Sequence, residues 1–356
     1  MSDAKYDKKI VDGLVNKIKD DPENIENYRE LTNIYIVNNE FDSALSIYNK
    51  MLEIFPNDVQ ALINSGSIYF YKKNFQKVIE LYLKAAVNDP SNPSIYFNLG
   101  NVYAEIGNFS NALKYYTKSI ELDKNQAQVY SALGILFQDN DNLDEAEEYY
   151  KKAIELDSGC GEYYVYLANI FQRKGDFAEA AKFYEKALEL NPNDSKASLC
   201  LANAYASMKM EKEAFKYFER TVKIEPENYS AWLCWAITLS DAGMTDKAMG
   251  LYKKAIEADP AKPNAYILLA NILTNEKRYE EAIELYKKAV KLVPREENRG
   301  KGILYVFIAN AYMLLENIHD AINYYRKALR EVPENNEVRL IYVEIMNAYI
   351  TRKVAK

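Results

Sequence analysis

The apolar residues of this chain recur with helical spacing, and the same helical pattern returns along most of its length. In the segment 93–105, Tyr96, Leu99 and Tyr103 stand at i, i+3 and i+7, which places them on one face of a helix. A turn of the type favoured by Gly107 and its neighbour follows, and a second stripe of helical period occupies residues 112–120. The pattern predicts a hairpin of two helices, called helix A and helix B below.

One recurring small residue fixes the period. It is Ala44, Val78, Ala112, Ala146, Ala180, Ala214, Ala248, Ala282 and Ala321. Neighbouring members are 34 residues apart, except for the last step of 39 (321 − 282). A fixed period in this range predicts a solenoid, in which small units bury their apolar faces against one another.

Two further positions repeat in phase with that residue. Counted from the start of each unit, position 8 is small: Thr32, Gly66, Gly100, Gly134, Ala168, Ala202, Ala236, Ala270 and Ala309. We expect helices A and B to cross here, because bulky side chains would separate their axes beyond the ~8–10 Å of close helix packing. Position 24 is large: Tyr48, Tyr82, Tyr116, Tyr150, Tyr184, Phe218, Tyr252, Tyr286 and Tyr325. We expect these rings to serve as knobs for the next hairpin.

The combined pattern, aromatic-x2-Leu-Gly/Ala-x2-Tyr…Ala-x3-Tyr/Phe…Pro, resembles the tetratricopeptide repeat, whose unit is 34 residues long. Nine units match, and they begin at Ile25, Val59, Pro93, Ala127, Gly161, Ser195, Tyr229, Pro263 and Gly302. The resemblance covers residues 25–333 and implies an all-α, right-handed superhelical solenoid of nine helix-turn-helix hairpins. Departures are local, such as Ser198 at the first aromatic position of unit six.

The ends and the one irregular step also give expectations. Residues 1–24 are predicted to form an N-terminal capping helix with Ile10, Leu14 and Ile18 on one side. Residues 334–356 are predicted to form a C-terminal capping helix. Its apolar side carries Val338, Ile341, Tyr342 and Ile345. The five extra residues before unit nine lengthen either a loop or the helix that follows.

Composition limits the function classes. Hydrophobic residues make up 49% of the chain and charged ones 27%, the balance of a folded, soluble protein. The net charge of −7 argues against a surface that tracks nucleic-acid phosphates, so no nucleic acid is expected as a partner. The sequence shows no apolar run long enough to span a bilayer and no signal peptide, and we expect a cytoplasmic location.

Catalytic and metal-binding chemistry is sparse. The single histidine, His319, precedes a predicted helix, and Cys160, Cys200 and Cys234 are too scattered to suggest a zinc site. Phosphate-binding glycine loops, nucleophile elbows and metalloprotease motifs are absent from the sequence. We therefore expect neither an enzyme nor a bound cofactor or metal, and we assign most of the tyrosines to packing.

The resemblance implies a concave groove, lined by positions 2, 5, 6, 9, 12 and 13 of each helix A, along which a peptide would lie. Position 9 is asparagine in six of nine units, as Asn33, Asn101, Asn169, Asn203, Asn271 and Asn310. An asparagine amide both donates and accepts hydrogen bonds, so this asparagine ladder could grip a peptide backbone. Alternatively, the same amides support the solenoid by bonding neighbouring helices, and the sequence leaves both options open.

The groove changes character along the chain. Its first units offer Arg29, Asn64 and Asn98, whereas units six to nine offer apolar side chains. These are Leu199, Cys200, Leu233, Cys234, Ile267, Leu268, Val306 and Phe307, with Ile237 at position 9. An exposed apolar stripe is typical of a partner surface, but neighbouring hairpins could also cover it. A clamp for acidic chain termini is not expected, because Ser94 and Asn98 stand where this resemblance would require cations.

Two functions remain from the sequence. The first is a non-catalytic adaptor that binds a peptide or helix of a partner protein in the groove and helps to assemble a complex. The second is the substrate-recognition arm of an enzyme, such as a glycosyltransferase, on another chain. Self-association is a further option that a single sequence does not decide.

Overall fold

The computed structural model describes residues 8–294 and 296–354, and every regular element in these ranges is a helix. The prediction of an all-α chain built from helical hairpins is confirmed. Residues 1–7 of the predicted N-terminal cap and residues 355–356 of the predicted C-terminal cap lie outside the described ranges.

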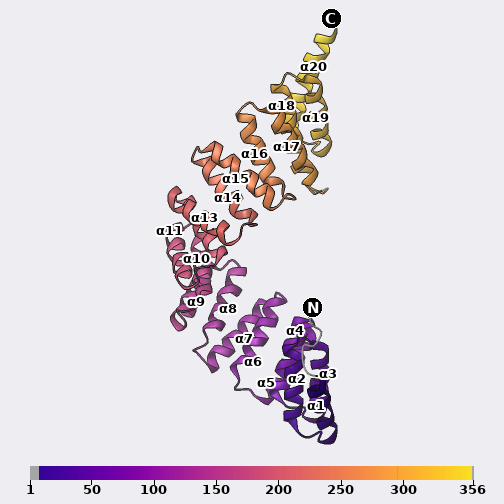
Figure 1. Cartoon of the computed structure of the whole chain (residues 1–356), viewed down its shortest axis with the longest axis vertical. Helices are drawn as coiled ribbons and strands as arrows, with labels where there is room; N and C mark the ends of the chain where they lie inside the picture. The colour runs from indigo at the N-terminus through magenta and orange to yellow at the C-terminus, as the bar shows by residue number, and fades with distance from the viewer. Residues whose placement is uncertain (1–7, 295, 355–356) are drawn as a thin grey trace. The chain divides into compact units, whose positions relative to one another are not determined.

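The helices follow one another in chain order (Figure 1). The first ten are α1 (Lys8–Asp20), α2 (Ile25–Val37), α3 (Phe41–Ile54), α4 (Val59–Tyr71), α5 (Phe75–Asn88), α6 (Pro93–Glu105), α7 (Phe109–Leu122), α8 (Ala127–Asp139), α9 (Leu143–Leu156) and α10 (Gly161–Lys174). The others are α11 (Phe177–Leu190), α12 (Ser195–Ser207), α13 (Glu211–Ile224), α14 (Tyr229–Asp241), α15 (Thr245–Ala258), α16 (Pro263–Asn275), α17 (Tyr279–Leu292), α18 (Asn298–Leu314), α19 (Ile318–Glu331) and α20 (Asn336–Val354).

The chain separates into two compact units, Met1–Ile170 and Phe171–Lys356, and α10 spans the boundary. In the first unit the hairpins are α2–α3, α4–α5, α6–α7 and α8–α9, and in the second they are α12–α13, α14–α15, α16–α17 and α18–α19. The even-numbered helix of each is helix A, and helix B of one hairpin also packs on helix A of the next within the same unit. The superhelical winding and the division into nine repeats with two caps stay predictions.

The turns between helices A and B share one backbone device. Each contains a residue in the left-handed region, such as Gly107 with φ 72° or Lys73 with φ 57°. At Gly107 the next amide, that of Asn108, donates to the carbonyl of Tyr103 at 2.8 Å, which ends the helix in a Schellman-type cap. The asparagine then caps helix B by accepting a hydrogen bond from the amide of Asn111.

The position-24 rings lie against the small position-8 residues of their own hairpin. A Cβ added to Gly100 would stand 2.4 Å from the ring of Tyr116, and one added to Gly66 would stand 2.3 Å from that of Tyr82. Real Cβ atoms do not approach a ring this closely, so the absence of a side chain is what admits the ring. Position 8 is therefore small because an aromatic side chain fills the crossing point.

The expectation that the rings serve as knobs for the next hairpin is confirmed for two of them, since the ring centroids of Tyr150 and Tyr166 are 5.5 Å apart and those of Tyr286 and Phe307 are 5.6 Å apart. Rings at this position also lie over the small residues of their own hairpin. Each ring thus sits where three helices meet: its own helix B, its own helix A and the next helix A. Nearly complete burial follows, with Tyr150 and Tyr184 at 0% exposure.

The end helices differ in part from expectation. In α1 the buried residues are Val11 and Leu14, whereas Ile10 is 56% exposed, so the predicted Ile10–Leu14–Ile18 stripe is wrong in its first member. Ile10 occupies the crossing position, and among the described residues no helix A covers it. In α20, Val338 is buried but Ile341 is 38% exposed.

The extra residues before unit nine lengthen the helix that follows, because α18 has 17 residues where other A helices of the unit have 13.

The first prediction concerns the crossing point. Replacing Gly100 by valine should destabilise the protein by about 1–3 kcal/mol, because the added side chain overlaps the Tyr116 ring and the two helices must separate. Urea denaturation followed by circular dichroism measures the loss.

Gly13 supplies the control, since a Cβ added there meets nothing within 4 Å and the residue lies inside α1. Gly13→Ala should leave stability unchanged or raise it by about 0.5–1 kcal/mol, the helix-propensity difference. Equal behaviour of the two variants would show that the ring does not require a bare backbone beneath it.

Candidate functional site

The predicted groove residues lie on the A helices of the hairpins. In the first unit, Arg29 and Asn33 on α2 meet Asn64 on α4 around one cavity of about 290 Å³, which Gln60 and the hydroxyl-bearing Tyr48 also line. Three of the predicted site residues are therefore brought together.

Arg29 is neutralised within this cavity. Its guanidinium pairs with Glu26 at 2.7 Å and with Asp58 at 3.3 Å, so its charge is shared between two carboxylates before any ligand arrives. An acidic chain terminus would have to displace both. The arrangement suits a ligand that accepts hydrogen bonds without carrying a strong charge.

Asn64 is held between two neighbours. Its Nδ2 group donates to the Tyr48 hydroxyl at 2.9 Å, and its Oδ1 atom accepts from Gln60 Nε2 at 2.9 Å. Because Tyr48 belongs to the preceding hairpin, the first of these bonds links two consecutive repeats. Asn64 is a structural link as well as a lining residue.

The position-9 asparagines are tied to the buried rings. Tyr116 donates to Asn101 Oδ1 at 2.8 Å, Tyr286 donates to Asn271 Oδ1 at 2.6 Å, and Tyr325 donates to Asn310 Oδ1. In each case ring and asparagine belong to the same hairpin. The tyrosine hydroxyl emerges from the three-helix junction at the groove face and fixes the amide there.

Not every hairpin uses the same partner. Tyr150 and Tyr184 donate instead to glutamines one helical turn further along helix A, Gln138 at 3.2 Å and Gln172 at 2.8 Å. Where Phe218 replaces tyrosine, Asn203 instead hydrogen-bonds the Cys234 thiol of the next helix A. Asn98 and Asn169 are half-buried and Asn33 is exposed.

The apolar residues of the second unit are half-covered by their neighbours. Leu233, Ile237, Ile267, Leu268 and Phe307 are partly buried and pack against the core of α14–α18. Val306 packs likewise against the cluster around Ala309 and Tyr325. Their exposed halves are the part of these side chains that a ligand could contact.

Burial shifts the tyrosine hydroxyls away from ionisation. It raises the pKa of Tyr116 well above its usual range, and it raises the pKa of Tyr252 to about 12, with the charge of Asp241 adding to the effect. Desolvation is the largest cause in both, because a phenolate in the three-helix junction would lose its hydration. The hydroxyls stay neutral donors at physiological pH.

Other reactive groups stand apart from this surface or are buried beside it. His319 is exposed at the start of α19, next to Asn323 at 3.3 Å. Cys160, Cys200 and Cys234 are free, and burial raises the pKa of the Cys200 and Cys234 thiols. Among the described residues, no group of three or more His, Cys, Asp or Glu side chains could hold a metal ion.

The sequence analysis did not predict the hydrogen bond between the position-24 tyrosine and the position-9 asparagine, although the repeat pattern contains evidence for it. Asn101–Tyr116, Asn271–Tyr286 and Asn310–Tyr325 share one separation of 15 residues. A side chain 15 residues further on in a hairpin of this length lies opposite the first, on the returning helix. Co-occurrence of asparagine and tyrosine at this separation was readable from the repeat pattern.

Comparison with known families gives a match along most of the chain. The profile described as Cilia and flagella-associated protein 70 C-terminal domain matches residues 23–230. Two profiles described as tetratricopeptide repeat match residues 239–303 and 303–335.

Among curated proteins, the bifunctional subunit NrfFG of the formate-dependent nitrite reductase complex from Haemophilus influenzae is 41% identical over 49 residues. That match covers 14% of this chain and 13% of the relative, so this chain spans only a small part of that protein.

Solved structures of similar proteins include MamA, with 26% identity, a TM-score of 0.45 and coverage of 47% of this chain and 92% of that one. YrrB, described as a TPR protein with an unusual peptide-binding site, has 27% identity, a TM-score of 0.43 and coverage of 51% and 93%. PilF of Pseudomonas aeruginosa has 18% identity, a TM-score of 0.49 and coverage of 62% and 98%.

Within the described residues, no helix has both the length and the apolar character that crossing a membrane requires.

A second prediction separates two asparagines of the ladder. Among the described residues, Tyr116 has Asn101 as its one side-chain acceptor, whereas Tyr286 also lies 3.4 Å from Thr274 Oγ1. Asn101→Ala should therefore cost about 1–3 kcal/mol of stability, the penalty of an unsatisfied buried hydroxyl, and Asn271→Ala should cost less. Urea denaturation of the two variants measures the difference.

Tyr116→Phe is the matched control, because it removes the hydroxyl that Asn101→Ala leaves unpaired. Combining the two substitutions should recover part of the loss caused by Asn101→Ala alone. Strict additivity of the two losses would mean that the hydroxyl and the amide do not depend on each other.

A third prediction follows from the tyrosine pKa shifts. The pKa of Tyr252 is raised from about 10 in an unfolded chain to about 12 in the fold, so its contribution to stability is complete below pH ~10 and declines as the pH rises through ~12. Urea midpoints measured from neutral to alkaline pH should fall in this window. In Tyr252→Phe the fall should be shallower, and an identical profile would assign the alkaline loss to other groups.

Proposed function

Because the chain belongs to the tetratricopeptide repeat family, we propose that it is a non-catalytic scaffold that holds a segment of a partner protein against the helix A faces of its hairpins. The partner is an extended peptide or a helix, and its capture assists the assembly of a larger complex. A cytoplasmic adaptor role is part of this proposal.

One observation supports the proposal most directly. Some asparagine amides at position 9 are held in place by a hydrogen bond to their oxygen, while their NH2 groups remain free within the described part of the chain. In Asn101 and Asn271 the Oδ1 atom accepts from a tyrosine, while the Nδ2 group has no hydrogen-bond partner among the described residues. Each amide therefore presents two N–H donors from a side chain whose rotamer is already restrained. Pre-organised donors bind with a smaller entropy loss than free ones.

This arrangement unites the two readings that the sequence left open. The carbonyl half of each asparagine serves the hairpin, and the amino half is available to a backbone carbonyl of a bound chain. Such donors recognise a backbone without requiring a particular side chain. The half-covered Leu233, Ile237 and Val306 add apolar contact, and they would select partners with apolar anchors.

The fourth prediction locates the bound partner. A photo-crosslinking phenylalanine analogue at Ile135, which occupies position 9 of α8 and is 38% exposed, should form covalent adducts with the partner in the cells that make this protein. Leu83 on helix B is 40% exposed and provides the matched site on the opposite side. Adducts from Leu83 alone would reject the groove as the binding surface.

The peptide identified within the adduct then allows affinity to be measured. Asn203→Ala and Asn271→Ala should each weaken its binding by about two- to tenfold, the value of one hydrogen bond, with little change in circular dichroism. These two are chosen because neither leaves a tyrosine hydroxyl without an alternative partner. Recovery of a catalytic chain, such as a transferase, in the adduct would favour the substrate-recognition arm instead.

A further inference from the structure

The side of each hairpin opposite the position-9 face is covered in several repeats by a pair of aromatic rings. One ring comes from position 11 of helix A and the other from position 23 of helix B. The pairs and their centroid separations are Tyr103–Tyr115 at 5.4 Å, Phe137–Tyr149 at 5.3 Å, Phe171–Phe183 at 5.4 Å, Tyr205–Tyr217 at 5.8 Å and Tyr312–Tyr324 at 5.6 Å. We call these the outer aromatic pairs.

Two lysines complete this cover on the α18–α19 hairpin. Lys327 of α19 lies 4.3 Å from the ring centroid of Tyr324, and Lys287 of the preceding α17 lies 5.8 Å from that of Tyr312. Ammonium groups at these distances are attracted to ring faces. The two rings and the two lysines therefore contact one another, and the surface of this hairpin is closed at this place.

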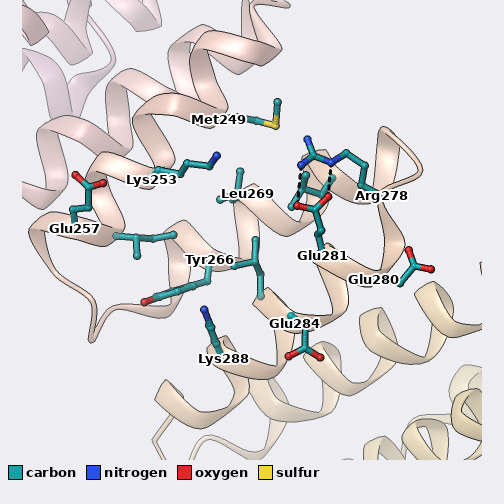
Figure 2. A pocket seen from close by; sticks show the side chains of 13 residues that line it. Met249, Lys253, Glu257, Tyr266, Leu269, Arg278, Glu280, Glu281, Glu284 and Lys288 are labelled. Atoms are coloured by element: carbon teal, nitrogen blue, oxygen red, sulfur yellow. Dashed lines mark hydrogen bonds and ion pairs between the residues drawn. The ribbon is translucent and has the colours of Figure 1, made fainter.

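The α16–α17 hairpin lacks the outer aromatic pair. Leu273 and Leu285 stand at positions 11 and 23, and an open pocket of about 670 Å³ lies between α15, α16 and α17 at this place. Figure 2 shows the pocket, with Tyr266 and Leu269 of α16 at its centre and Met249 of α15 at its edge. The neighbouring α14–α15 hairpin also has two leucines, but there Trp232 and Trp235 stack 6.0 Å apart.

The two lysines are present without their rings. Lys253 and Lys288 occupy the places equivalent to Lys287 and Lys327, and both line the pocket. Figure 2 shows their ammonium groups on either side of Tyr266. The hydrogen bond from Arg278 is the largest cause that lowers the pKa of the Glu281 carboxyl, and the charge of Lys253 adds a smaller contribution. Neither Lys253 nor Lys288 forms an ion pair or a hydrogen bond with a described residue.

The acidic side chains of the rim are mostly engaged elsewhere. Glu257 pairs with Lys254 at 2.9 Å, Glu281 pairs with Arg278 at 2.7 Å, and Glu284 pairs with Lys287 at 2.9 Å. The fourth, Glu280, lies at the edge of the pocket away from the two lysines (Figure 2). The end of the pocket around Tyr266 is thus apolar in its floor, and its rim carries Lys253 and Lys288, which are unpaired among the described residues, beside Glu257, which is paired with Lys254.

We propose that this pocket is a second docking site, distinct from the groove, for a partner segment that inserts an aromatic side chain next to acidic residues. The inserted ring takes the space that the outer aromatic pair fills in other repeats. Lys253 and Lys288 cover it as Lys287 and Lys327 cover Tyr312 and Tyr324, and they attract the flanking carboxylates. The α18–α19 hairpin is the intramolecular template for the complex.

The fifth prediction tests this site with synthetic peptides. The probe is Gly-Asp-Glu-Phe-Tyr-Glu-Asp-Gly, and the readout is the methyl resonance of Met249 in protein with isotope-labelled methionines, assigned through Met249→Leu. The probe should shift this resonance in a saturable way. A version with alanines for the two aromatic residues should not shift it, and one with Asn and Gln for the acidic residues should bind more weakly.

Variants of the pocket provide the second arm. Leu273→Tyr combined with Leu285→Tyr restores the outer aromatic pair of the α18–α19 hairpin, so it should fill the pocket and abolish binding while the fold is kept. Lys253→Gln and Lys288→Gln should each weaken binding by roughly two- to fivefold. Lys254→Gln, which removes a neighbouring lysine already paired with Glu257, should leave the affinity unchanged.

The contrary results are equally definite. Absence of a Met249 shift at peptide concentrations on the order of 1 mM, or undiminished binding by the double tyrosine variant, overturns the proposal. An equal shift with dodecanoate would show that the pocket takes any apolar carboxylate and would reject the aromatic part. Asn203→Ala and Asn271→Ala should not alter this binding, so the groove and the pocket can fail independently.

Discussion

The architecture depends on one steric match, a tyrosine ring on helix B that lies over a residue of helix A with little or no side chain. At Gly66, Gly100 and Gly134 the ring occupies the volume where a Cβ would stand. The ring fixes the helix separation, and it also reaches the next helix A, so one side chain sets both the shape of a hairpin and its contact with its neighbour. A solenoid needs both, because a single hairpin cannot bury its apolar face alone.

The same ring is buried in the core, while its hydroxyl reaches the polar side chains of helix A. A phenylalanine would satisfy the packing, and Phe218 does so in α13 with 0% exposure. The tyrosines add a hydroxyl whose burial demands a partner, and for Tyr116 and Tyr184 that partner is an asparagine or a glutamine of helix A. The polar groove is therefore partly a consequence of the core. An asparagine at position 9 is explained before any ligand is considered, and its unused amino group is what a ligand gains.

The repeat period carries most of the fold, because a pattern sampled nine times averages out local departures. Helix starts such as Ile25, Val59 and Pro93 coincide with the starts of the repeated pattern. What the pattern could not give is direction in space. It placed the large position-24 residues toward the next hairpin, but it did not show that the same rings also fill the space beside the small residue of their own helix A. It also placed Ile10 on the buried side, although the crossing position is covered only when a helix A precedes it.

The repeat pattern does not predict surface features that arise where one repeat departs from its neighbours. Leu273 and Leu285 are unremarkable apolar residues in an apolar stripe, and only the comparison with Tyr312 and Tyr324 shows that two rings are missing. The lysines at the equivalent places, Lys253 and Lys288, are nevertheless present in the α16–α17 pocket. Lys287 has a ring face to contact, whereas Lys253, at the equivalent place one hairpin earlier, has no such contact within the part of the chain that the structure describes. In a solenoid, a lysine without the aromatic ring that its equivalent contacts in another repeat marks a surface with an unpaired group. A second molecule can supply the missing contact at such a surface.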